Sequence, residues 1–112
     1  MPPSKSPGSV FGKRLRAARL ASGLSQAQLA EVLGLKEQNT GAPRISRYET
    51  GQHDPDPATA EALAKALGMP VAYFHATSDV LAELILVASR LPPAKQKEAL
   101  EHLKSFAASL KR

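Results

Sequence analysis

Two arginines in the middle of the chain have the spacing and chemistry needed to read a polar surface. Arg44 and Arg47 lie three residues apart with Ser46 between them, and Ile45 and Tyr48 follow the same spacing. Residues three apart are neighbours on a helix, so Ile45 and Tyr48 predict a packed face that leaves the arginines and the serine on the outer face. A guanidinium group forms paired hydrogen bonds with phosphate or with the O6 and N7 atoms of guanine. The chemistry predicted here is therefore recognition of a nucleic acid.

A second short helix is predicted just before this one. Ser25, followed three residues later by Gln28, has the pattern of a capping box. Gly34 is expected to end the helix, because glycine adopts the left-handed conformation at little cost. The two helices, 25–33 and 43–50, are expected to pack against each other, an arrangement typical of a helix-turn-helix. The apolar residues at helical spacing in the first of them are Leu29 and either Val32 or Leu33.

Around this pair the sequence predicts an all-α domain. Helices are expected at 10–22, 25–33, 43–50, 57–67 and 70–76, joined by short connections. Asp56 followed by Pro57 is an N-cap followed by proline at the first helical position. The preceding segment, 1–9, is rich in proline, serine and glycine, and we expect a disordered arm that is not a signal peptide.

Two further helices are predicted in the C-terminal part, with Asp79 capping the first and Pro92-Pro93 separating them. Each carries an apolar stripe with a seven-residue repeat, which suits contacts between helices. Two interpretations compete: the helices fold back on their own domain, or they pair with a second chain. Two stripes on so small a domain favour a homodimer through residues 79–110. The stripes are Leu81, Leu84, Ala88 and Leu91 in the first helix, and Leu100, Leu103, Phe106, Ala107 and Leu110 in the second.

Charge and composition narrow the function classes. Residues 1–52 carry eight Lys and Arg against three Glu, residues 53–91 two against five acids, and residues 92–112 five against two. The positive charge therefore lies with the predicted helix pair, as expected for a protein that binds polyanions. The chain has no cysteine, which excludes disulfides and thiol catalysis and suits a reducing cytoplasm. The longest aliphatic run, 84–88, is too short to span a membrane, so we expect a soluble, cytoplasmic protein.

The ordered set of motifs resembles the Cro/C1-type (XRE-like) helix-turn-helix transcriptional regulators of bacteria and phages. The resemblance runs from about Val10 to Phe74 and departs from the family in one place. Between Gly34 and Ile45 this chain has ten residues, 35–44, where family members have a shorter turn. The matching segments are Phe11–Arg16, Arg19, Gly23–Gln26, Leu29–Ala30, Ile45–Gly51, Pro55 and Leu63–Gly68.

The resemblance implies a five-helix, lambda-repressor-like DNA-binding domain at 10–76, followed by a helical extension at 77–112 for dimerisation. It implies a sequence-specific double-stranded DNA-binding transcriptional regulator, with repression on a two-fold operator as the favoured mode. Two alternatives remain open. One is an antitoxin whose C-terminal helices cover a toxin and which regulates its own operon; the other is a helical protein-interaction module without a specific DNA site. A polymerase would be a further protein partner.

Candidate site residues fall into three groups: base readers, which include residues of the enlarged turn, a structural ion pair and phosphate contacts. Arg47 matches a position that touches bases in the family, and Arg44 and Ser46 share the outer face of its helix. Arg19 and Glu49 match a structural ion pair of the family. Gln38, Asn39 and Thr40, in the enlarged turn, are equally well explained as base readers or as ordinary turn residues. By resemblance or by charge, the expected phosphate contacts are Gln26, Lys13, Arg16, Thr50, Gln52 and His53.

Catalysis, metal binding and cofactor binding are not expected. The three histidines, His53, His75 and His102, are far apart in the sequence. His75 has an acidic residue four positions later, Asp79, and this pair is better explained as a helix end and a cap. No glycine-rich phosphate loop or nucleophile motif is present.

Overall fold

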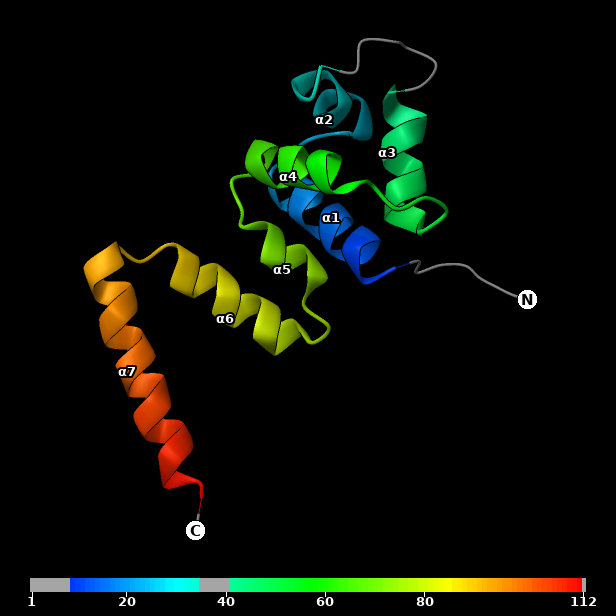
Figure 1. Ribbon diagram of the computed structural model, residues 1–112. Coiled ribbons are helices and arrows are strands. Elements are labelled where there is room, and N and C mark those ends of the chain that lie inside the picture. Colours follow the sequence, from blue (N-terminus) through cyan, green and yellow to red (C-terminus); the bar gives the residue numbers. More distant parts are fainter. Residues whose placement is uncertain (1–8, 35–40, 112) are drawn as a thin grey trace.

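The computed structural model describes residues 9–34 and 41–111, and these residues form α-helices without any strand (Figure 1). The all-α prediction is confirmed. Helices α1 to α5 form a compact group, from which α6 and α7 extend as an open V (Figure 1). The helices are α1 (Val10–Ala21), α2 (Gln26–Val32), α3 (Gly41–Thr50), α4 (Pro57–Ala66), α5 (Val71–His75), α6 (Asp79–Ser89) and α7 (Pro93–Ser109).

Side-chain caps fix where α2 and α4 begin. The capping box is confirmed: Gln28 N donates to Ser25 Oγ at 3.0 Å, and Ser25 N donates to Gln28 Oε1 at 2.8 Å. At α4, Thr59 N donates to Asp56 Oδ1 at 2.8 Å. Hydrogen bonding by the side chain and the backbone of Thr59 lowers the pKa of the Asp56 carboxyl. Because folding lowers the pKa of Asp56, its carboxylate stabilises the fold at pH values above the ordinary carboxyl pKa. This stabilisation is lost as the pH falls through the lowered pKa and the carboxyl group is protonated.

Two predicted helix starts are wrong. Helix α3 begins at Gly41 and not at residue 43, so the last four residues of the long turn are already helical. Pro43 is compatible with this because it falls in the first turn, where the backbone N–H has no partner within the helix. Ser78, and not Asp79, caps α6: Leu81 N donates to Ser78 Oγ at 2.9 Å, and Asp79 is the first helical residue.

The core lies between α1, α2, α3, α4 and α5. Helix α2 packs against α3, and α1 packs against α3 and α5. The predicted core residues Leu29, Ile45 and Tyr48 are buried, and the alternative at the end of α2 is decided for Leu33, because Val32 is 59% exposed. The fully buried large side chains are Phe74, Leu15, Leu29, Ile45 and Leu63.

The two C-terminal helices bury little within one chain. Helix α6 packs on α5 with Ala82 buried, and Ile85 and Leu86 half-buried on the same side. The predicted stripe lies on its other side, with Leu81 and Leu84 each about half exposed. Helix α7 has no buried residue, so these helices do not fold back on the domain as a closed hairpin.

None of the helices in segments 9–34 and 41–111 is long and apolar enough to cross a membrane.

Candidate nucleic-acid interface

Helix α3 has one packed face and one open face. Gly41, Ile45, Tyr48 and Glu49 are buried. At 100° per residue these positions share one side of the helix, which places Arg47 on the opposite side. Arg47 is exposed, and Ser46 and Pro43 on the same outer side are half-buried. The helix therefore offers a guanidinium group and a hydroxyl group to a partner.

A buried ion pair holds the packed face of α3 against α1. Arg19 Nε lies 2.6 Å from Glu49 Oε2, and Arg19 Nη2 donates to Glu49 Oε1 at 3.1 Å. Both side chains are almost fully buried, and Arg19 Nη1 donates to the carbonyl oxygen of Leu24 at 2.8 Å. The fork of the guanidinium group thus joins α1, α3 and the turn before α2.

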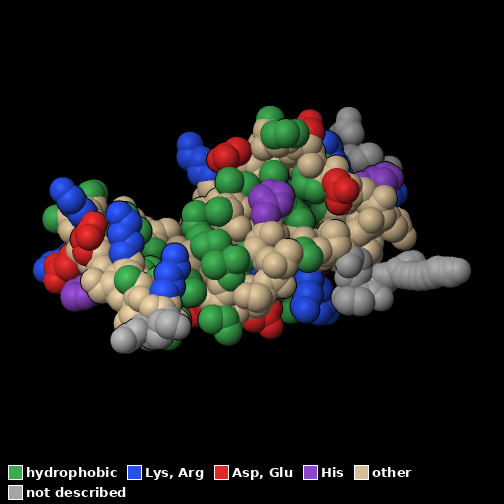
Figure 2. Space-filling view, turned by 60° about the horizontal axis from the view of Figure 1, so that its bottom comes forward, with side chains coloured by type: hydrophobic (Ala, Val, Ile, Leu, Met, Phe, Trp, Pro, Cys, Tyr) green, Lys and Arg blue, Asp and Glu red, His purple; other side chains and the backbone are tan. Residues whose placement is uncertain are grey.

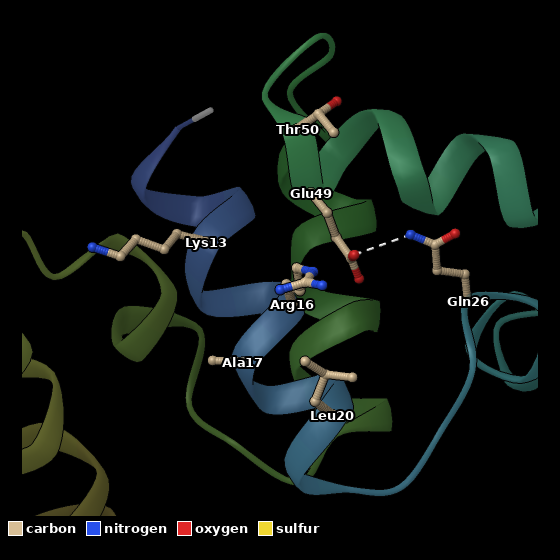
Figure 3. A pocket seen from close by; sticks show the side chains of 7 residues that line it. All are labelled: Lys13, Arg16, Ala17, Leu20, Gln26, Glu49 and Thr50. Carbon is tan, nitrogen blue, oxygen red and sulfur yellow. Dashed lines mark hydrogen bonds between the residues drawn. The ribbon is translucent and has the colours of Figure 1, made fainter. Parts of the chain in front are cut away.

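The amide of Gln26 extends this network to α2. Gln26 Nε2 donates to Glu49 Oε1 at 3.1 Å, so one carboxylate accepts hydrogen bonds from two other helices (Figure 3). The residue stays half-exposed, and its amide has a second N–H that this bond does not use. Glu49 therefore fixes the position of a side chain that is expected to contact a phosphate.

Four of the six expected phosphate contacts line one groove. Lys13 and Arg16 come from α1, Gln26 from α2 and Thr50 from the end of α3, around a volume of about 550 Å³ that Ala17, Leu20 and Glu49 complete. In Figure 3, Gln26 points toward Glu49, whereas Lys13 points away from it. Gln52 and His53 are exposed in the turn after α3 but do not line this groove.

Arg44 lies on the flank of α3. It is exposed, but Arg44 Nε donates to the hydroxyl of Tyr48 at 3.0 Å. It also lines a small hollow with Leu33 and Thr59, on the side of α3 that faces α4. Arg47 therefore occupies the centre of the outer face and Arg44 its edge. The other expected base readers, Gln38, Asn39 and Thr40, lie outside the described residues.

Reasoning from the sequence missed two residues that position this surface. Gly12 is buried where α1 meets the end of α3, and a Cβ there would lie 2.6 Å from the carbonyl oxygen of Glu49 and also against that of Tyr48. Arg14 is 8% exposed, and Arg14 Nε donates to the carbonyl oxygen of Ala76 at 2.9 Å. A signal was present for Arg14: it falls on the apolar stripe of α1, where a charged group needs a buried partner.

The histidine and acid considered for a metal have other contacts. The ring of His75 lies against the ring of Phe11, with 5.4 Å between the centroids and 48° between the planes, and Asp79 Oδ1 accepts from Arg14 Nη1 at 3.0 Å. Within 9–34 and 41–111, no three histidine or acidic side chains gather at one point.

This fold and this surface define a helix-turn-helix protein, and comparison with known proteins agrees. A family model described as a helix-turn-helix domain matches residues 10–74, more than half of the chain. The chain belongs to this family, as the motif set predicted.

The chain is also similar to a curated protein and to a solved structure. An uncharacterized HTH-type transcriptional regulator, YonR, derived from the SPbeta prophage of Bacillus subtilis (strain 168), is 37% identical over 60 residues. These residues are 54% of this chain and 51% of that protein, so the chain spans about half the length of this curated relative. The crystal structure of the transcriptional regulator BswR superimposes with a TM-score of 0.78 at 39% identity, covering 88% of this chain and 96% of that chain. The superimposed part is longer than residues 1–74, so the likeness includes part of the C-terminal extension.

Proposed function

We propose that this protein is a sequence-specific DNA-binding regulator of transcription that acts as a repressor, with two copies bound to a two-fold operator. The observation that carries the proposal is the outer face of α3. Arg47 is exposed at its centre, while its inner face is held to α1 and α2 by Arg19, Glu49 and Gln26. A short helix held in this way fits the major groove of B-form DNA, with Arg47 at base edges and Arg44 at the edge of the interface.

The groove beside α3 supplies the sequence-independent part of binding. Lys13, Arg16, Gln26 and Thr50 line it. The first three come from α1 and α2, and Thr50 is the last residue of α3, one turn beyond Arg47. Contacts of this kind set the position of a protein on the duplex, and the charged ones make its affinity depend on salt. The transcriptional regulators YonR and BswR support the same function class.

Arg47→Ala tests the reading role. We expect it to reduce affinity for the preferred duplex by about 1–3 kcal/mol and to relax one base position in each half-site, because a bidentate arginine–guanine pair is lost. The preferred duplex is first selected from a random pool, and affinities for it and for a random duplex are then measured at fixed salt.

Arg90→Ala is the matched control, because Arg90 is exposed at the far end of α6. It should leave the base preference unchanged. If Arg47→Ala weakens specific and random duplexes equally, Arg47 is a phosphate contact and the reading role is wrong.

The proposed dimer uses the exposed apolar sides of α6 and α7. Leu100 and Leu103 are each 50% exposed and Phe106 is 65% exposed, although all three lie on one stripe of a well-formed helix. Figure 2 shows hydrophobic side chains gathered on the middle of one face, beside a projecting lobe that carries charged side chains. A second copy of the chain would cover the apolar sides of these helices.

Leu103→Glu tests the dimer without disturbing the fold, since α7 buries nothing within its own chain. We expect the variant to be monomeric in sedimentation at concentrations where the wild type is dimeric. It should bind a full operator about 10²–10⁴-fold more weakly, because the second reader is no longer linked to the first.

Ser105→Glu adds the same charge on the opposite side of α7 and should leave the dimer intact. A wild-type protein that is monomeric at micromolar concentration would contradict the dimer. In that case the apolar stripe of α7 would be covered by a different protein, as the antitoxin interpretation requires.

A further inference from the structure

The buried side chain of Arg14 joins the DNA-reading domain to the extension. It lies in α1 and donates from Nε to the carbonyl oxygen of Ala76 and from Nη1 to Asp79 Oδ1, at 2.9 and 3.0 Å. Its guanidinium carbon lies 5.7 Å from the centre of the Tyr73 ring, close enough for a cation–π contact. One side chain thus contacts the end of α5, the connection after it and the first residue of α6.

Helix α6 also packs on α5 but buries little there. Ala82 is its one buried residue among those described, and Ile85 and Leu86 are half-buried. The connection from α5 to α6 is three residues long, 76–78, and Ala76 is buried beside the arginine. A guanidinium group that donates to both ends of so short a connection limits the rotation of α6 relative to α1.

We propose that Arg14 is a positioning residue that fixes the direction of α6 relative to the recognition helix, and thereby sets the distance between the two half-sites that a dimer reads. The inference rests on the dimer proposed above. Two ion pairs link these helices in series: α3 is held to α1 by Arg19 and Glu49, and α1 is held to α6 by Arg14 and Asp79. If two copies pair through α6 and α7, the separation of their recognition helices follows from this chain of contacts.

Arg14→Met tests the proposal, since methionine keeps an unbranched apolar stem and removes both hydrogen bonds. A panel of duplexes carries two identical half-sites with spacers of different length. The wild type is expected to prefer one spacer by about tenfold or more over its neighbours, because only there do both readers engage. Arg14→Met should flatten this preference to about threefold or less, while affinity for a single half-site and the dimer dissociation constant change less than about twofold.

A second measurement follows α6 directly. The chain has no cysteine, so spin labels can be placed only at Ala21→Cys on α1 and Ser89→Cys on α6, with excess unlabelled chain to exclude distances between copies. The wild type should give one narrow distance distribution, and Arg14→Met a broad one. Arg90→Met, which removes an exposed arginine at the end of α6, should change neither the spacer profile nor the distances.

Asp79→Ala keeps the proposal testable if Arg14→Met unfolds. The Asp79 side chain is 82% exposed, so its removal should not unfold the domain, and Arg14 keeps its bond to Ala76. An intermediate flattening of the spacer profile is expected. An unchanged spacer profile in both variants overturns the role of Arg14, even if the protein is a dimer that binds two half-sites. If Arg14→Met is unfolded, an unchanged profile in Asp79→Ala overturns it by itself. A monomeric wild type overturns the dimer and this inference together.

Discussion

Glu49→Ala is expected to lower the free energy of unfolding by about 3–5 kcal/mol, since removing one partner of a buried ion pair leaves the other charge without compensation. Arg19, whose side chain is 8% exposed, would lose both carboxylate oxygens and, among the described residues, keep the carbonyl oxygen of Leu24 as its acceptor. Gln26 would lose its acceptor as well. Urea denaturation followed by circular dichroism measures the loss, and the effect is a large share of the stability of a domain of this size.

The double variant Arg19→Ala/Glu49→Ala should lose less than the sum of the two single variants, because both remove the same pair. Glu61→Ala is the control: Glu61 is exposed on α4, and its removal should change stability by no more than about 0.5 kcal/mol. Strictly additive losses would mean that Arg19 and Glu49 do not interact in solution.

Gly12→Ala is the second large effect, and its sign is informative. In an exposed helix this substitution would stabilise by about 1 kcal/mol, because alanine is the better helix former. In α1 the added methyl group would lie 2.6 Å from the carbonyl oxygen of Glu49, and backbone atoms cannot turn away as a side chain can. We therefore expect a net destabilisation of about 1–3 kcal/mol, seen as a lower Tm in calorimetry.

The same methyl group would push α3 away from α1, so affinity for the selected duplex should fall as well. Ala21→Ser, which adds one atom at an exposed position of the same helix, should change stability by no more than about 0.5 kcal/mol. A higher Tm for Gly12→Ala would show that the two helices are not in close contact at this point.

Local patterns in the sequence were sufficient for the helices, their order and the protein class. Capping at Ser25 and Asp56 depends on residues three apart, and the packed face of α3 follows from Ile45 and Tyr48 one turn apart. Such signals lie within one helix and need no knowledge of its neighbours. The motif set predicted the helix-turn-helix family for the same reason: its residues are read in order along the chain.

Tertiary structure decided which residues far apart in the sequence meet. Arg14 reaches Asp79, 65 residues away, and Gln26 reaches Glu49, 23 residues away. Helix α6 is apolar on two sides. Periodicity identified the stripe that contains Leu81 and Leu84, but it did not show that the domain covers the other side, where Ala82 lies. A helical repeat gives the angle between residues on one helix and says nothing of what lies against each side. That depends on how the helices pack, and only the tertiary structure determines it.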